Sequence, residues 1–197
     1  MSRTLVFACV IALAAILPTG VATQGPPPNP RVVIETTRGD ITCELFRAQA
    51  PVSVANFLTY VQDGFYAGTI FHRVIRNFMI QGGGMTEDLT RKTDGLRGGI
   101  LNEATNKLEN HRGTLAMART AAPNSARSQF FINVVGNSSL DHRNTTPQGY
   151  GYAVFGKVID GMHVVDDIHG VRTRRVNDMN DVPLQPIVIK RIRRLEP

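Results

Sequence analysis

Short runs of strand-forming residues, separated by turn residues, constrain the fold of this 197-residue chain more than any other feature. Eight such runs occur, at 31–37, 41–45, 69–75, 78–81, 113–118, 129–134, 152–158 and 187–192. Only two stretches follow helical spacing, one beginning at Pro51 and ending at Gly64, the other beginning at Met162 and ending at Gly170. Because closure removes exposed strand edges, this pattern predicts a mainly β fold. We expect a closed eight-stranded antiparallel β-barrel capped by two α-helices.

The first 30 residues have a different character from the rest of the chain. Arg3 precedes an uninterrupted apolar run of 13 residues, and small residues follow at 20–22. This pattern is typical of a secretory signal peptide over residues 1–22. At about 1.5 Å per residue the run falls short of a hydrocarbon core about 30 Å thick, so an uncleaved membrane anchor is the weaker interpretation. We expect export, with the periplasm as the favoured destination and no stable membrane insertion after cleavage.

Proline-rich composition marks residues 23–30 as a stiff linker, and residues 31–197 form one predicted domain. Cleavage of the signal would remove Cys9 and leave Cys43 alone, so no intramolecular disulfide is expected. Cys43 shares a strand face with Ile41 and Leu45, which predicts a buried, inert thiol.

Basic residues cluster at 172–175 and 190–194, within a chain of net charge +6. The functional interpretation is binding to an anionic partner. The favoured interpretation is a solvated loop and a terminal strand with outward-facing cations. We expect no nucleic-acid partner.

Residues 71–84 carry the most informative motif. In an alternating strand Phe71, Arg73 and Ile75 would share one face, which places a guanidinium among apolar neighbours. An arginine on a strand is ordinarily solvated, so this residue alone would not indicate a site. Further blocks follow at 113–119, 128–133, 139–141 and 152–158.

These blocks, in this order, resemble the cyclophilins, which fold as an eight-stranded barrel and isomerise peptide bonds preceding proline. The resemblance covers about residues 31 to 194, and the residues of the motifs are similar to those of the bacterial periplasmic branch. It implies that Arg73 is the catalytic arginine, assisted by Gln81. It also implies a set of substrate-binding residues: Phe78, Met79, Ala118, Arg119, Thr120, Gln129, Phe131, Leu140 and Tyr152. The backbone of residues 118–120 is expected to meet the substrate as an extra strand does.

The chemistry explains why such a site contains an arginine. Amide resonance opposes rotation with a barrier of about 20 kcal/mol, and rotation requires neither a nucleophile nor loss of a proton. As resonance is lost the imide nitrogen becomes basic, so a donor aimed at it acts only in the transition state. Gln81 could hold the guanidinium or accept the moving carbonyl, and both roles stay open. The five histidines show no metal-ligand spacing, and we expect no metal and no cofactor.

Three departures from the family pattern affect the site region. Arg76-Asn77 stands where many cyclophilins carry Pro-Gly. Ser139 and Tyr152 stand where animal cytosolic members carry Trp and His. None of them removes the implied catalytic residues. The expected partners are unfolded or partly folded proline-containing polypeptides, bound by a monomer. The alternative is a non-catalytic module of the same fold that binds proline peptides.

Overall fold

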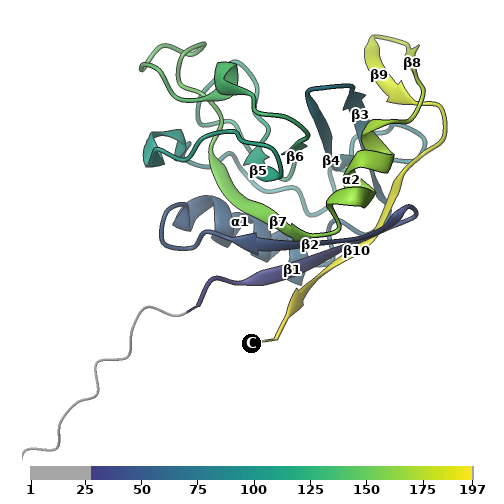
Figure 1. Cartoon of the computed structure of the whole chain (residues 1–197), viewed down its shortest axis with the longest axis horizontal. Helices are drawn as coiled ribbons and strands as arrows, with labels where there is room; N and C mark the ends of the chain where they lie inside the picture. The colour runs from purple at the N-terminus through teal and green to yellow at the C-terminus, as the bar shows by residue number, and fades with distance from the viewer. Residues whose placement is uncertain (1–27, 197) are drawn as a thin grey trace, which may run out of the picture.

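The computed structural model describes residues 28–196, so the expected signal peptide and residues 23–27 of the linker lie outside the described part of the chain. Within it, ten strands, two α-helices and two short 3₁₀ helices follow one another (Figure 1). The strands are β1 Arg31–Thr36, β2 Gly39–Leu45, β3 Thr69–Ile75, β4 Met79–Thr86, β5 Thr114–Met117, β6 Phe130–Asn133, β7 Val154–Asp160, β8 Thr173–Val176, β9 Met179–Pro183 and β10 Val188–Leu195. The helices are α1 Pro51–Gln62, η1 Ala104–Asn106, η2 Ser138–Leu140 and α2 Met162–His169.

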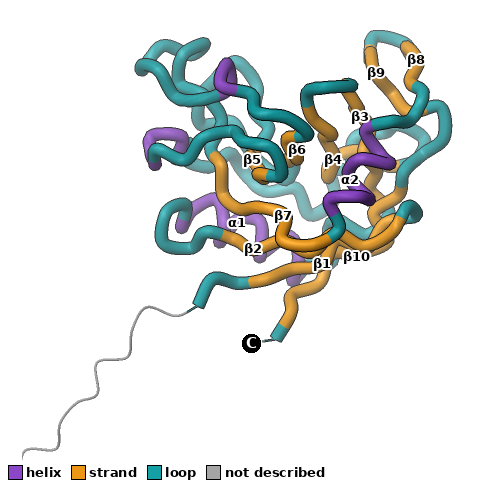
Figure 2. The backbone as a smooth tube through the Cα atoms, viewed as in Figure 1, coloured by secondary structure: helices purple, strands orange, loops and turns teal. Residues whose placement is uncertain are grey.

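Eight of the strands close into a barrel in the order β1-β10-β3-β4-β6-β5-β7-β2, with every pair antiparallel. β1 pairs with β2, which completes the ring. The predicted eight-stranded barrel with two helices is therefore confirmed. Figure 2 shows that loops make up most of the chain between β4 and β7, where β5 and β6 are short.

The main core fills the barrel and binds both helices to it. α1 begins at Pro51, which a first helical turn tolerates because its missing N–H would have no partner there. Its Phe57 is fully buried and contacts the rings of Tyr66, Phe130 and Phe155 at centroid distances of 5.1 to 5.4 Å. α2 adds Val164, Val165 and Ile168 to the same cluster. No helix among residues 28–196 is long and apolar enough to cross a bilayer.

A hairpin replaces the loop expected at residues 172–175. β8 and β9 form a separate two-stranded sheet, and β9 packs against β3 (Figure 1). β8 reads Thr-Arg-Arg-Val and exposes most of its side chains, so it lacks the apolar alternation that marks a strand. Asn177 turns the chain with a positive φ of 51°, and Val182 and Pro183 are the buried residues of β9.

A β-bulge corrects the expectation that Phe71 and Arg73 share a face. The register between β3 and β4 shifts between these two residues. Phe71 therefore lies in the main core, whereas Ile75 packs in a second apolar cluster outside the barrel. A bulge inserts a residue and reverses the alternation beyond it.

The C-terminal basic run is partly neutralised within the barrel wall. Arg191 and Arg193 both donate to the carboxylate of Glu35, at 2.7 and 2.8 Å. These bonds, the one to Arg191 foremost, lower the pKa of Glu35. Cys43 is fully buried, and burial raises the pKa of its thiol, as the inert interpretation requires.

Candidate active site

A small cavity of about 100 Å³ lies on the outer surface of the barrel. Nine of the eleven residues named from the sequence line it together: Arg73, Phe78, Met79, Gln81, Ala118, Arg119, Phe131, Leu140 and Tyr152. They come from β3, β4 and the turn between them, from β6, and from the segments that follow β5 and β6. The structure thus brings residues almost 80 positions apart to one place.

Strand alternation separates this site from the core. Ile80 and Ile132 point into the barrel, whereas Met79 and Phe131 point outward into a second apolar cluster. Met79 and Phe131 are 2% and 4% exposed, so they form a nearly dry floor. Their burial gives the pocket an apolar base of fixed shape, suited to a small saturated ring.

Polar groups line one edge of this floor. Arg73 lies opposite Gln81 in the β3–β4 ladder, and its guanidinium makes a long contact of 3.5 Å with Oε1 of Gln81. Gln81 in turn donates from Nε2 to Oε1 of Gln129 at 2.8 Å. Within residues 28–196 Arg73 forms no ion pair, so its remaining donors are available to a ligand.

The turn between β3 and β4 positions Phe78. Asn77 takes a positive φ of 56°, a conformation that Asn tolerates better than most residues. The N–H of Phe78 donates to the carbonyl of Ile75 at 3.2 Å and closes the turn. Arg76-Asn77 therefore makes a tight turn without the Pro-Gly of many relatives, and Arg76 stays outside the pocket lining.

Arg119 and Tyr152 build the opposite wall. The Arg119 guanidinium lies 4.7 Å from the Tyr152 ring centroid and donates to the carbonyls of Gly151 and Pro147 at 2.9 and 2.8 Å. The Tyr152 ring meets Phe131 edge-on, with centroids 5.7 Å apart. Arg119 is thus a wall residue, and its guanidinium is engaged by carbonyl oxygens.

The backbone beside this wall offers a place for a bound chain. The N–H of Ala118 is bonded to Gln129 and that of Thr120 to Ser125, at 3.0 and 2.9 Å. Among residues 28–196 no hydrogen bond uses the main-chain N–H or C=O of Arg119. An extended peptide could therefore pair with this residue as an added strand.

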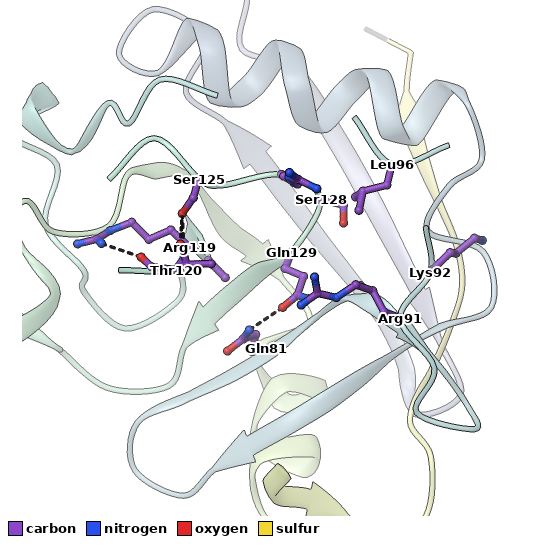
Figure 3. Close-up of a pocket in the computed structure, with 12 residues that line it drawn as sticks. Gln81, Arg91, Lys92, Leu96, Arg119, Thr120, Ser125, Ser128 and Gln129 are labelled. Atoms are coloured by element: carbon purple, nitrogen blue, oxygen red, sulfur yellow. Dashed lines mark hydrogen bonds between the residues drawn. The ribbon is translucent and has the colours of Figure 1, made fainter. Parts of the chain in front are cut away.

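The other two residues named from the sequence, Thr120 and Gln129, line an adjoining pocket of about 380 Å³ (Figure 3). Sequence reasoning missed the cations that also line it, Arg91, Lys92 and Arg127. They belong to loops, and nothing in their spacing marks them as neighbours. Gly84 is required here, because a Cβ at this position would collide with the Gln129 side chain.

His72 lies next to Arg73 but does not line the small cavity, and it borders a different pocket. Its side chain is 7% exposed, and its Nδ1 has no hydrogen-bond partner among the described residues. Burial, opposed by a backbone hydrogen bond to Ile70 and aided by the charge of Arg73, lowers the pKa of His72 to about 4. The imidazole is therefore neutral throughout the physiological range. No group of three or more His, Cys, Asp or Glu among residues 28–196 could hold a metal ion.

This buried imidazole should make the protein acid-sensitive. Below pH 6.5 the unfolded chain protonates His72 while the folded chain resists down to about pH 4. The free energy of unfolding should therefore fall across that window, by as much as about 3 kcal/mol. Urea unfolding at pH 7 and pH 4 measures the loss. His72→Gln should lose less stability than wild type over this range, whereas His163→Gln, on an exposed residue, should match wild type. Equal losses in all three would contradict the assignment.

Comparison with known proteins agrees with this geometry. Residues 31–194 match the family described as cyclophilin type peptidyl-prolyl cis-trans isomerase/CLD. The chain is 54% identical over 159 residues to peptidyl-prolyl cis-trans isomerase cyp18 of Streptomyces antibioticus, which covers 81% of this chain and 95% of that protein. It is 51% identical to isomerase B of Escherichia coli K12, over 82% of this chain and 97% of that protein. Isomerase A of Dickeya dadantii is 48% identical, over 92% and 90%.

Solved structures agree on the architecture. A cyclophilin type peptidyl-prolyl cis-trans isomerase of Cryptosporidium parvum superposes with a TM-score of 0.70 at 31% identity, over 86% of this chain and 99% of that one. Fold and site thus place an apolar pocket with a polar edge on the outer surface of a closed barrel. The chain belongs to the cyclophilin-type peptidyl-prolyl cis-trans isomerases, and it is an enzyme of that class.

Proposed function

We propose that this isomerase assists the folding of exported chains, and that Arg73 promotes rotation of the peptide bond preceding proline. The observation that carries the mechanism is the Arg73 guanidinium, which forms no ion pair within residues 28–196 and lies at the edge of a nearly dry apolar floor. The floor would hold the proline ring. The guanidinium would then donate to the imide nitrogen as that nitrogen loses resonance.

The proposed mechanism relies on differential binding. In either planar isomer the nitrogen lone pair is delocalised into the carbonyl and is a poor acceptor. In the twisted state the lone pair is localised, so a hydrogen bond from Arg73 strengthens only there. Arginine suits the task because it stays protonated and presents several donors in a fixed plane. The apolar floor excludes water that would compete for the same nitrogen.

Gln81 is proposed to position Arg73 rather than to bind the moving carbonyl. Its Oε1 faces the guanidinium, and its Nε2 is already engaged by Gln129 at 2.8 Å. The bond to Gln129 fixes the orientation of the amide and therefore the side that faces Arg73. Gln129 thus acts on Arg73 through Gln81.

Catalysis by Arg73 predicts a flat pH profile. Arginine remains charged, and His72, with its pKa of about 4, remains neutral across neutral pH. We expect kcat/KM for an X–Pro peptide to be constant between about pH 6 and pH 8. The measurement is a peptide isomerisation assay over that range, with folded protein verified at each pH. A bell-shaped profile would show that an ionising group catalyses the reaction.

Export is proposed from the N-terminal pattern. The basic start, the 13-residue apolar run and the small residues at 20–22 support a cleaved signal. We expect the mature protein to begin at Thr23 and to be found outside the cytoplasm. Mass spectrometry of the purified native protein gives its N-terminus directly. An intact Met1 on membrane-bound protein would support the anchor instead.

A further inference from the structure

The adjoining pocket shares Gln81, Ala118 and Arg119 with the proline pocket, so the two form one continuous groove. We propose that this second pocket selects an acidic side chain two residues before the proline, through the guanidinium groups of Arg91 and Arg127. The selection rests on the proposed function, because it requires the proline ring to occupy the first pocket.

The second pocket is positively charged without an internal counter-charge. Arg91, Lys92 and Arg127 line it, and no Asp or Glu does. Within residues 28–196 none of the three cations forms an ion pair. The Lys92 ammonium donates to the carbonyl of Ala67 at 2.9 Å and lies 5.3 Å from the Phe65 ring centroid, and neither partner carries a negative charge. Since no carboxylate of the described residues lines this pocket, a carboxylate that pairs with these cations inside it has to come from a ligand.

Both arginines project from anchored backbone. The carbonyl of Arg127 accepts a hydrogen bond from the Asn56 amide of α1 at 2.7 Å. Arg91 pairs with Met85 through an isolated β-bridge at the end of β4. Figure 3 shows Arg91 extending toward Gln129, and so toward the side shared with the proline pocket. The loop backbone that carries each arginine is therefore tied to a neighbouring element, α1 for Arg127 and β4 for Arg91.

Strand geometry sets which substrate residue reaches this pocket. In an extended chain, alternate side chains point to the same face and lie about 7 Å apart. When the proline enters the first pocket, its immediate neighbour points away. The residue two positions along then points to the same side of the groove and enters the second pocket.

The direction of the substrate follows from the course of the backbone at Arg119, whose N–H and C=O form no hydrogen bond within residues 28–196. Residues 118–120 run from the proline pocket to the second pocket, since Ala118 lines both and Thr120 only the second. Every ladder of the barrel is antiparallel, and antiparallel pairing is the more frequent arrangement. A substrate strand antiparallel to this segment passes the second pocket first. The selected residue therefore precedes the proline.

A carboxylate is the side chain that matches these donors. Arginine binds carboxylates through two parallel charge-assisted hydrogen bonds, which a neutral amide cannot reproduce. A lysine in the same place would meet like charge. Asp178 and Asp181 border a neighbouring cavity that Arg91 also lines, but neither lines this pocket.

The test compares three peptides that differ only two residues before the proline, with Glu, Gln or Lys. At low ionic strength wild-type kcat/KM should be about threefold to tenfold higher for Glu than for Gln, and lowest for Lys. Added salt should reduce the Glu/Gln ratio. The double variant Arg91→Gln/Arg127→Gln should bring the ratio close to one. Arg194→Gln, on an exposed arginine of β10, should keep the wild-type ratio.

The ratio separates this inference from the proposed function. Arg73→Ala should slow all three peptides and leave the Glu/Gln ratio in place. Turnover of all peptides with a ratio near one, or with Lys preferred, would overturn the pocket assignment alone. So would a Glu preference that survives the double variant, or one that occurs two residues after the proline. A rate insensitive to Arg73→Ala would instead contradict the proposed mechanism.

Discussion

Arg73→Ala is expected to lower kcat/KM for an X–Pro peptide tenfold or more, a loss of at least about 1.4 kcal/mol of transition-state stabilisation. Arg73 is exposed at the pocket edge, and the only side-chain hydrogen bond of its guanidinium within the described residues is the long one to Gln81. Its removal therefore leaves the apolar floor in place. The variant should remain folded and lose rate.

Two further variants sharpen this result. Arg73→Lys retains the charge but loses the planar set of donors, so its kcat/KM should lie between those of wild type and Arg73→Ala. Arg76→Ala is the matched control, because Arg76 is exposed on the same hairpin but donates to Gly170 at 3.1 Å, away from the pocket. A peptide isomerisation assay on all four proteins measures the effect. An unchanged rate in folded Arg73→Ala would reject its catalytic role.

Phe130→Ala should cost about 3 to 5 kcal/mol of folding free energy, the range for removing a buried aromatic ring. Phe130 is fully buried, and its ring meets Phe57, Tyr66 and Phe71 edge-on at 5.4, 5.6 and 6.1 Å. The cavity left behind lies between α1 and the barrel, where backbone on both sides limits collapse. Urea denaturation of the variant and wild type gives the difference.

An exposed apolar residue supplies the control for this stability effect. Leu101 is 57% exposed, so Leu101→Ala should change the free energy of unfolding by less than about 0.5 kcal/mol. If Phe130→Ala cost no more than Leu101→Ala, the ring cluster would not hold α1 to the barrel.

The barrel could be predicted from the sequence because its strands alternate and Gly, Pro or Asn separates them. The same rule failed at β8, where Arg174 and Arg175 occupy a strand that buries almost nothing. Backbone pairing with β9, rather than side-chain burial, forms that strand. Hydrophobic alternation carries no signal for a ladder of this kind.

Side-chain direction in the site was predictable only in part. Nine residues named from the motifs line one pocket, because ordered blocks report a shared architecture. The bulge between Phe71 and Arg73 could not be predicted from the sequence, because it depends on the register in which β3 pairs with β4. The cations of the second pocket could not be predicted from the sequence either. Arg91 and Arg127 lie in separate loops, and only the folded chain brings them together.

Arg73 is proposed to stabilise the twisted imide and to contribute little to binding of either planar isomer. Exchange NMR on a proline peptide tests this most directly, because it yields both the cis–trans exchange rate on the enzyme and the peptide Kd. In Arg73→Ala the on-enzyme exchange rate should fall tenfold or more, while Kd changes by less than about threefold. A Kd weakened tenfold or more in Arg73→Ala, with the on-enzyme exchange rate unchanged, would contradict this role of Arg73.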